Sequence, residues 1–176
     1  MLKINERRQL MTKPSTREPN YWDRFFIGMA EYVATASKDP STKCGAVIVR
    51  PDKSVASVGF NGFAKGCDDD PALYANRELK YERVVHAEVN AILLAREPLA
   101  GYTIYTYPPG YGPSCARCSS HIIQAGIIRV VHIQDKSEFA LRWKPSAEIG
   151  LKMYEEAGVE VVVAGVRNTT IASHER

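Results

Sequence analysis

The sequence is poor in the features that mark membrane, secreted and nucleic-acid-binding proteins. Its 176 residues contain no apolar run near the ~20 residues that a helix needs to cross a bilayer. No apolar segment follows the charged N-terminus, so we expect no secretory signal. The net charge is only +3, which is small beside the strongly basic surface of a nucleic-acid-binding domain. These absences predict a cytoplasmic protein with no membrane partner and no stable nucleic-acid partner.

Cysteine is also scarce, and the four cysteines do not form the pattern of a disulfide framework. Cys115 and Cys118 stand as a C-x-x-C pair, whereas Cys44 lies against an apolar strand and Cys67 in an acidic loop. No feature of the sequence pairs Cys44 with Cys67. A reducing compartment is the simpler interpretation, because disulfides persist mainly in secreted proteins.

What the sequence does contain is enough apolar residues for one folded domain. Of its 176 residues, 45% are hydrophobic and 24% are charged, which is typical of a domain with a real core. Residues 21–165 carry the regular pattern and are predicted to form that domain. Residues 1–20 are predicted to form a solvated basic arm. The alternative is that they contact a neighbouring subunit or a ligand phosphate. Residues 166–176 are predicted to be a C-terminal tail.

Apolar periodicity and turn residues predict alternating helices and strands. Asn20 can cap the first helix, and Pro51 suits the second position of a tight turn between two strands. The predicted helices cover about 21–37, 84–96, 114–125 and 146–156, and the predicted strands cover 45–49, 55–60, 103–106, 127–133 and 159–163. The order α-β-β-α-β-α-β-α-β predicts an α/β domain with three layers, α-β-α, and a five-stranded mixed sheet.

Two segments carry further expectations about packing. Apolar residues at three- and four-residue spacing in the first helix, including Trp22, Phe25 and Tyr32, predict a stripe that packs in the core. Residues 61–83 are polar and lack periodicity, so they are predicted to form a long irregular loop.

The residues His86, Ala87 and Glu88, together with Cys115 and Cys118 further along, predict a metal site. One histidine and two cysteines supply three zinc ligands, whereas a structural zinc site is normally closed by four protein ligands. Three ligands leave a position for water, and Glu88 can sit beside that water without binding the metal. A C-x-x-C pair alone also marks redox and structural sites. The alternative is therefore a buried structural histidine with an unrelated thiol pair.

These two motifs resemble the H-x-E and C-x-x-C motifs of the zinc-dependent nucleobase and nucleotide deaminases. Further segments closely resemble the deoxycytidylate (dCMP) deaminases: S-K-D-P-S-T-K at 37–43, G-F-N-G at 59–62, G-C-D-D at 66–69, V-H-A-E-V-N-A-I at 85–92 and I-I-Q-A-G-I at 122–127. The resemblance extends over about 21–163. Two residues depart from the family pattern, because Ser114 separates Pro113 from the first cysteine and Phe60 replaces a tyrosine.

The resemblance implies a cytidine-deaminase-like fold, a catalytic Zn²⁺ and the hydrolytic conversion of dCMP to dUMP and ammonia. In such an enzyme zinc lowers the pKa of a bound water toward ~7. The implied zinc ligands are His86, Cys115 and Cys118, and the implied carrier of protons between water and base is Glu88.

Substrate-binding residues follow partly from the same resemblance. It implies that the backbone N–H of Ala87 binds the base oxygen and that Asn61 holds the sugar hydroxyl, although Asn61 also suits a turn. A short cationic, hydroxyl-bearing segment is in addition expected to reach the 5′-phosphate, with a solvated loop as the alternative. The residues of that segment are Lys38, Ser41, Thr42 and Lys43.

Regulation and assembly are implied by the resemblance alone. Many dCMP deaminases are homohexamers that dCTP activates and dTTP inhibits, with Mg²⁺ accompanying the triphosphate. The regulatory site of such enzymes involves the segment that is here Gly59, Phe60, Asn61 and Gly62. The resemblance therefore implies effector nucleotides, a homo-oligomer, and a product that feeds thymidylate synthesis.

Two other functions compete with this interpretation. The protein could deaminate another substrate, such as a free nucleoside or an adenosine in tRNA, although the lack of a strongly basic face argues against a polynucleotide. It could also be a catalytically silent zinc-binding interaction module on the same scaffold. Glu88 argues against the second alternative, because a purely structural zinc site has no use for it.

Overall fold

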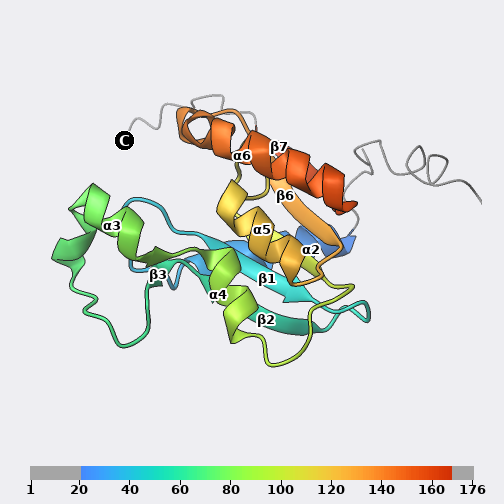
Figure 1. Cartoon of the computed structure of the whole chain (residues 1–176), viewed down its shortest axis with the longest axis horizontal. Coiled ribbons are helices and arrows are strands. Elements are labelled where there is room, and N and C mark those ends of the chain that lie inside the picture. The colour runs from blue at the N-terminus through green and yellow to red at the C-terminus, as the bar shows by residue number, and fades with distance from the viewer. Residues whose placement is uncertain (1–20, 168–176) are drawn as a thin grey trace, which may run out of the picture.

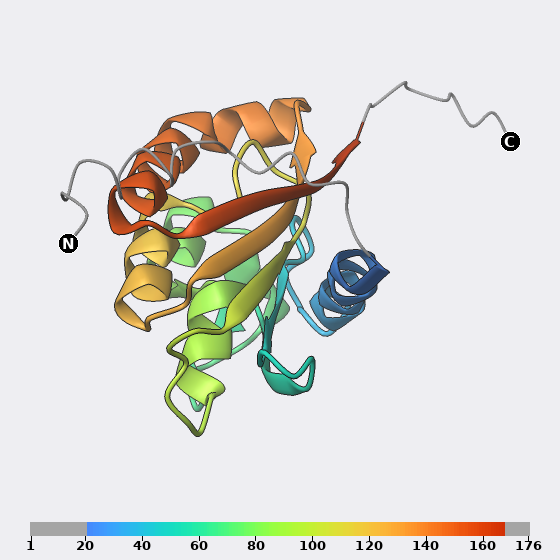
Figure 2. The ribbon, with the colours of Figure 1, turned by 90° about the vertical axis from the view of Figure 1, so that its right-hand side faces the viewer.

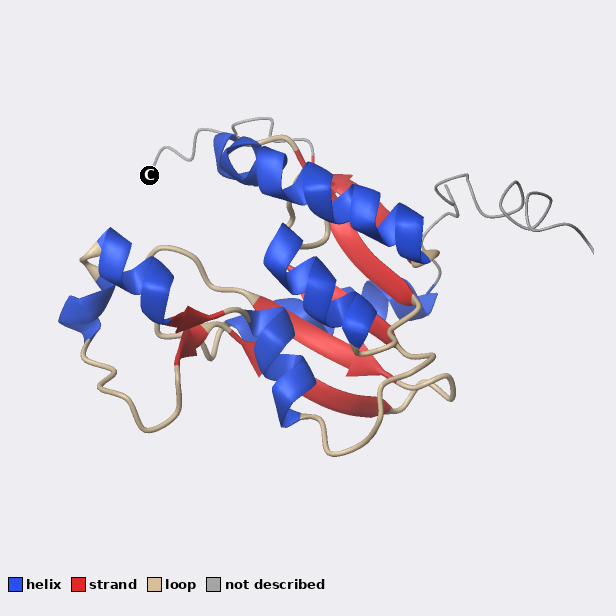
Figure 3. Cartoon of the chain, viewed as in Figure 1, coloured by secondary structure: helices blue, strands red, loops and turns tan. Residues whose placement is uncertain are grey.

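A computed structural model of the chain describes residues 21–167. The predicted arm, residues 1–20, and residues 168–176 of the predicted tail lie outside the described residues. The described chain forms the expected three-layer α/β domain around a five-stranded mixed sheet (Figures 1 and 3). Within residues 21–167, no helix is both long enough and apolar enough to span a membrane.

The main sheet has the strand order β2-β1-β5-β6-β7. Strand β1 is buried along its whole length and pairs antiparallel with both of its neighbours. Strands β5, β6 and β7 run parallel to one another, so helices must cross over between them. The bounds are β1 (Gly45–Val49), β2 (Val55–Phe60), β5 (Thr103–Tyr107), β6 (Arg129–Asp135) and β7 (Glu160–Arg167).

Helices cover both faces of this sheet. Figure 2 shows α2 on one side and α4, α5 and α6 on the other. Successive residues of β1 point to opposite faces, so Ile48 joins the core under α4 and α5, whereas Val47 joins the core under α2. The helix bounds are α2 (Tyr21–Ala34), α4 (Ala87–Leu94), α5 (Ala116–Gln124) and α6 (Glu138–Ala157).

Two glycines allow helices to lie very close to the sheet. A Cβ atom at Gly45 would overlap the backbone of α2 at Ala30. A Cβ atom at Gly59 would overlap the backbone of α4 at Ala87 and Ala91. Because α4 follows directly after His86, Gly59 of β2 also fixes the distance between the sheet and the candidate metal site.

We expect Gly59→Ala to lower the free energy of unfolding by about 1–3 kcal/mol, because the new methyl group must displace backbone atoms. Gly62→Ala is the matched control, since a Cβ at Gly62 meets nothing within 4 Å. Urea denaturation of both variants measures the difference. Equal stability of the two variants would show that α4 does not need a glycine beneath it.

The first helix corrects one expectation about the core. Phe26 and Ala30 are buried against the sheet, but Trp22, Phe25 and Tyr32 are exposed. The predicted apolar stripe is wider than the single face that α2 presents to the sheet. Its outer aromatic residues therefore lie on the surface of the described chain, and their placement in the core was wrong.

The segment 61–83 is only partly the irregular loop that was predicted. A two-stranded sheet pairs β3 (Gly62–Phe63) with β4 (Val84–Val85). Between these two strands, the chain forms a 3-10 turn, η1 (Pro71–Tyr74), and α3 (Arg77–Arg83). Asp70 and Asn76 cap the last two elements by accepting bonds from backbone N–H groups. These short elements depend on caps and on tertiary contacts rather than on apolar periodicity.

The last helix begins eight residues before its predicted start. The Ser137 side chain caps α6, and Pro145 lies inside the helix instead of ending it. Proline removes one helical hydrogen bond, which a long helix packed on α5 can tolerate. The early start brings the residues from 138 to 145 into the helical layer above the sheet.

Candidate metal centre

The three predicted zinc ligands meet at the N-terminal ends of two helices. His86 is the N-cap residue of α4, Cys115 is the N-cap residue of α5, and Cys118 lies in the first turn of α5. In the described chain, neither N-cap side chain makes a capping bond to its own helix, so both are directed elsewhere. The sequence placed His86 and Cys115 inside the first turn, and the structure moves each of them one position before it.

The spacing of the three donor atoms suits a zinc ion. The His86 Nδ1 atom lies 3.5 Å from the Cys115 Sγ atom and 3.3 Å from the Cys118 Sγ atom, and all three donors lie within 4.8 Å of one another. Tetrahedral zinc with its usual bond lengths separates such donors by roughly 3.6 Å. No fourth His, Cys, Asp or Glu of residues 21–167 joins this group. Three ligands of these types are the set that a catalytic zinc site uses.

Electrostatics favour a thiolate at this position. The hydrogen bond with Cys118, followed by the one with His86, lowers the pKa of the Cys115 thiol to about 4. The same contact with Cys115 raises the pKa of His86. The thiolate is the form of cysteine that binds metal. The pair Cys115 and His86 therefore already has the charge distribution of a metal site.

Glu88 stands beside the ligands without belonging to the donor group. It lies in the first turn of α4, two residues after His86. Burial raises the pKa of the Glu88 carboxyl, and the negative charge of Cys115 raises it further. A carboxyl shifted upward from its ordinary value is better matched to giving and taking protons near neutral pH.

Ala87 occupies the first position of α4, and its side chain is buried. The first N–H groups of a helix have no acceptor within that helix. The Ala87 N–H therefore points out of the helix at the end where the metal ligands gather. This is a suitable position for a hydrogen bond to a carbonyl oxygen of a ligand.

The additional residue Ser114 does not displace the ligands. Its hydroxyl forms hydrogen bonds with Ser119 Oγ at 2.9 Å and with Tyr154 OH at 2.8 Å. These contacts fix the start of α5 against α6. The predicted helix 114–125 starts at Ser114, but Cys115 is the N-cap residue of α5, and Ser114 packs inside the domain.

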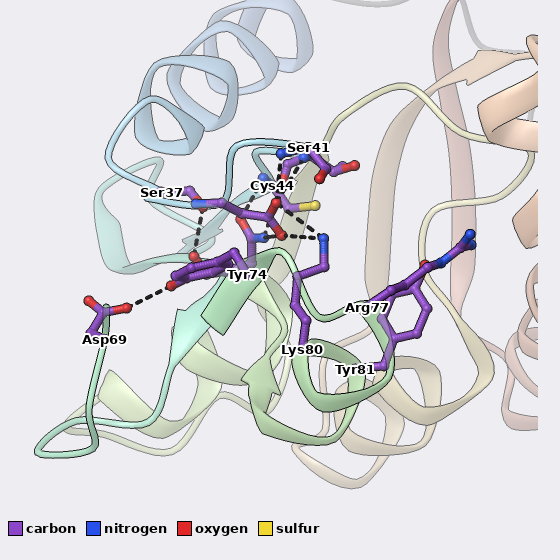
Figure 4. Close-up of polar contacts among 11 residues, drawn as sticks. Ser37, Ser41, Cys44, Asp69, Tyr74, Arg77, Lys80 and Tyr81 are labelled. Carbon is purple, nitrogen blue, oxygen red and sulfur yellow. Dashed lines mark hydrogen bonds and ion pairs between the residues drawn. The ribbon is translucent and has the colours of Figure 1, made fainter. Parts of the chain in front are cut away.

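Asn61 is buried and uses its side-chain amide within the protein. Its Oδ1 accepts from the Cys44 N–H at 2.8 Å, and its Nδ2 donates to the Thr42 carbonyl at 2.9 Å. A buried ion pair supports the same region, because Lys80 Nζ lies 3.1 Å from an Asp39 oxygen (Figure 4). Asn61 thus shapes the segment after α2 that carries the proposed phosphate ligands.

The structure brings Lys38, Ser41, Thr42 and Lys43 onto one connecting segment between α2 and β1. Asp39 holds this segment by accepting from the N–H groups of Ser41 and Thr42. Lys38 forms an exposed ion pair with Asp69 at 2.7 Å, and Lys43 donates to the Ser37 carbonyl at 2.7 Å. Exposed ion pairs of this kind contribute little stability, so a stronger anion can replace such a partner.

Sequence reasoning missed two groups beside the centre. One is the buried pair of Asp39 and Lys80, whose partners come from separate elements. The other is a pair of aromatic rings, Tyr81 and Trp143, of which Trp143 contacts the His86 ring. No motif or spacing in the sequence signals either group, because both depend on how α3 and α6 pack.

Comparisons with known proteins agree with this geometry. The family model described as "Cytidine and deoxycytidylate deaminase zinc-binding region" matches residues 20–134. An "Uncharacterized deaminase in luxG 3'region" of Aliivibrio fischeri is 42% identical, with 80% of this chain and 91% of the relative covered. A "Probable deoxycytidylate deaminase" of Drosophila melanogaster is 34% identical, with 86% and 78% covered.

The fold has a solved counterpart. The crystal structure of a dCMP deaminase from the cyanophage S-TIM5, in apo form, matches with a TM-score of 0.59. The alignment covers 82% of this chain and 96% of that chain, at 23% sequence identity. This likeness confirms the predicted architecture of the domain.

Proposed function

The chain belongs to the cytidine and deoxycytidylate deaminase family, and we propose that it is a zinc-dependent enzyme that hydrolyses dCMP to dUMP and ammonia. One observation carries this proposal. Glu88 lies beside a group of three zinc-ligand side chains without joining it. That arrangement provides a site for a metal, a position for water and a separate proton carrier. The names of relatives such as the Drosophila protein support the choice of substrate.

The reaction needs a nucleophile and two proton transfers. His86, Cys115 and Cys118 would hold the zinc ion, which when bound would act as a Lewis acid and lower the pKa of water at the site. Glu88 takes a proton from the water that attacks C4 of cytosine and delivers it to N3. The same carboxyl then takes the proton of the hydroxyl newly attached to C4 and carries it to the leaving amino group, so that ammonia departs and C4 becomes a carbonyl. Because Glu88 passes on each proton that it accepts, one carboxyl serves both transfers.

Two groups are proposed to orient the nucleoside. The Ala87 N–H, at the first position of α4, is directed to the base oxygen O2. Asn61 is assigned to the sugar hydroxyl, and its amide must then exchange one of its present contacts, such as that with Thr42, for the substrate. Ala87 belongs to the helix that begins directly after His86. Asn61 contacts the connecting segment after α2 through the Thr42 carbonyl.

The 5′-phosphate is assigned to Lys38, Ser41, Thr42 and Lys43. We expect dCMP to be deaminated at least roughly tenfold better than deoxycytidine, since hydrogen bonds to charged groups contribute ~1.5–3 kcal/mol and ~1.4 kcal/mol is a factor of ten. Replacing Lys38 and Lys43 together with glutamine should erase much of this preference and leave deoxycytidine turnover little changed. Lys152→Gln, at an exposed lysine of α6, is the control.

Regulation by dCTP and dTTP with Mg²⁺ is proposed for the segment Gly59, Phe60, Asn61 and Gly62. Phe60 is exposed on the edge strand β2, where a ligand can reach it. Asn90 of α4 donates to the Phe60 carbonyl at 2.8 Å, and Gly59 packs against the backbone of α4. A nucleotide bound at this segment would therefore act on the helix that carries Glu88. We also propose that the protein forms a homo-oligomer, acts in the cytoplasm and supplies dUMP for thymidylate synthesis.

Loss of ultraviolet absorbance on deamination distinguishes the competing functions. The purified, zinc-containing protein is incubated separately with dCMP, CMP, deoxycytidine, dCTP and an adenosine-containing tRNA. We expect the highest kcat/KM with dCMP. A higher value with deoxycytidine or with tRNA would replace the substrate assignment. A full zinc content without turnover of any of these compounds would indicate a silent zinc-binding module.

A further inference from the structure

The helix that carries two of the three predicted zinc ligands takes a capping contact from another helix. Cys115 is the N-cap residue of α5, but its side chain makes no capping bond, and its Sγ atom lies 3.5 Å from His86 Nδ1 instead. The first N–H groups of a helix have no acceptor within that helix. Here the Ala116 N–H donates to Ser146 Oγ of α6 at 3.0 Å. Ser146 thus supplies the acceptor that the Cys115 side chain does not provide.

Three hydroxyl groups support the carbonyl side of Cys115. Ser119 Oγ donates to the Cys115 carbonyl at 3.0 Å. Ser114 Oγ lies 2.9 Å from Ser119 Oγ and 2.8 Å from Tyr154 OH. We call Tyr154, Ser114 and Ser119 the hydroxyl chain, and all three residues are buried. The hydroxyl chain therefore connects α6 to the backbone of a metal ligand.

Each hydroxyl has a single proton, which fixes the direction of the hydroxyl chain. A carbonyl oxygen can only accept, so the Ser119 proton points to Cys115. Ser119 then accepts from Ser114, and Ser114 accepts from Tyr154. Because every proton of the hydroxyl chain is used, the loss of one member leaves a buried polar partner without its hydrogen bond. A buried group in that state shifts to find another partner, and the start of α5 is expected to shift with it.

One face of α6 supplies both supports. Ser146, Gly150 and Tyr154 follow one another at intervals of four residues, which places them along one side of the helix. Gly150 allows a close approach, because a Cβ atom at this position would overlap Ser119 Oγ. Figures 1 and 3 show α6 beside α5. This face lies beyond residue 134, where the match to the family model ends.

We propose that Ser146 and the hydroxyl chain are positioning residues, which hold the start of α5 so that its two cysteines stay beside His86. The proposal rests on the proposed zinc centre but not on the identity of the substrate. Ser146 holds the N–H side of the first turn of α5, and the hydroxyl chain holds the carbonyl of its N-cap residue. Groups that orient metal ligands typically change metal affinity by about 10–100-fold.

Loss of either support should weaken zinc binding. We expect Ser146→Ala and Tyr154→Phe each to lower the zinc affinity of the full chain about 10–100-fold, measured by competition with a chromophoric chelator. Tyr154→Phe keeps the buried ring and removes only the hydroxyl. Ser146→Thr keeps a hydroxyl and should retain most of the affinity. The controls are Ser120→Ala, at an exposed serine of α5, and Tyr32→Phe, at an exposed tyrosine, and both should bind zinc as the unchanged protein does.

Cobalt(II) in place of zinc provides a readout of ligand geometry. Its visible absorption bands depend on how the donor atoms are arranged around the ion, whereas a general loss of stability lowers the amount of bound ion without moving the bands. The Ser146→Ala and Tyr154→Phe proteins, saturated with Co²⁺, should therefore show shifted bands. The control proteins should show the bands of the unchanged protein. Circular dichroism verifies that each variant is folded.

The outcomes separate the positioning role from the proposed function. Unchanged zinc affinity and unchanged cobalt bands in the two variants would contradict the positioning role, even if the protein deaminates dCMP. Weaker zinc binding with unmoved bands would also contradict it, because that result indicates a general loss of stability. Weaker zinc binding with shifted bands would support the positioning role, even if no cytosine compound is deaminated and the proposed function fails.

Discussion

Glu88→Gln should leave the zinc content and the fold unchanged and lower kcat for dCMP by at least about a hundredfold. General acid–base catalysis typically contributes ~10²–10⁴-fold, and Glu88 is assigned both proton transfers. The glutamine amide matches the carboxylate in shape but cannot accept and release a proton. Because Glu88 is not in the donor group of the metal site, its replacement should not release zinc.

Absorbance assays with dCMP measure the loss of activity, and elemental analysis measures the zinc content. Glu82→Gln is a matched control, since Glu82 is an exposed glutamate of α3 close to the same motif. The control should keep nearly full activity. If Glu88→Gln retained more than about a hundredth of the original rate, another group would have to move the protons.

Cys115→Ala and Cys118→Ala should each lose zinc and all activity, because either change leaves two protein ligands where three are needed. Cys44→Ala and Cys67→Ala should keep one zinc per chain. Cys67 is exposed outside the group, and burial raises the pKa of the Cys44 thiol, so Cys44 stays protonated. Elemental analysis of the four purified variants decides the ligand set.

The same four variants reveal a wrong assignment. One zinc per chain in Cys115→Ala would mean that Ser114 and its neighbours hold the metal in a different way. Loss of zinc from Cys44→Ala, with an intact circular dichroism spectrum, would bring Cys44 into the ligand set. Neither result agrees with donor atoms that meet within 4.8 Å in the group of His86, Cys115 and Cys118.

Local features of the sequence predicted much of the fold. Strands 45–49 and 55–60 have the predicted bounds, because apolar residues, glycines and a proline-containing turn define both of their ends. The start of α6 was missed, since the helix was predicted to begin at Ser146 and the Ser137 cap was not recognised. The exposed aromatic residues of α2 show a second limit. Periodicity finds an apolar helix face but does not give the width of the surface that covers it.

In the candidate site, too, the residues within short motifs were predicted and the contacts between distant residues were not. The zinc ligands and Glu88 lie within two short motifs, and helix geometry fixes the positions of the residues within each motif. The packing of α4 beside α5 then brings the two motifs together. The buried pair of Asp39 and Lys80 and the ring contact between Trp143 and His86 join residues far apart in sequence. Such contacts depend on tertiary packing, and no spacing rule predicts them.

The zinc-dependent conversion of dCMP is the central claim, and product analysis tests it most directly. The purified protein is incubated with dCMP, then again after removal of zinc by a chelator, and once more after zinc is restored. We predict one dUMP and one ammonia for each dCMP consumed, loss of activity with zinc, and recovery when zinc returns. A fully zinc-loaded, folded protein that leaves dCMP unchanged would contradict this account of the site.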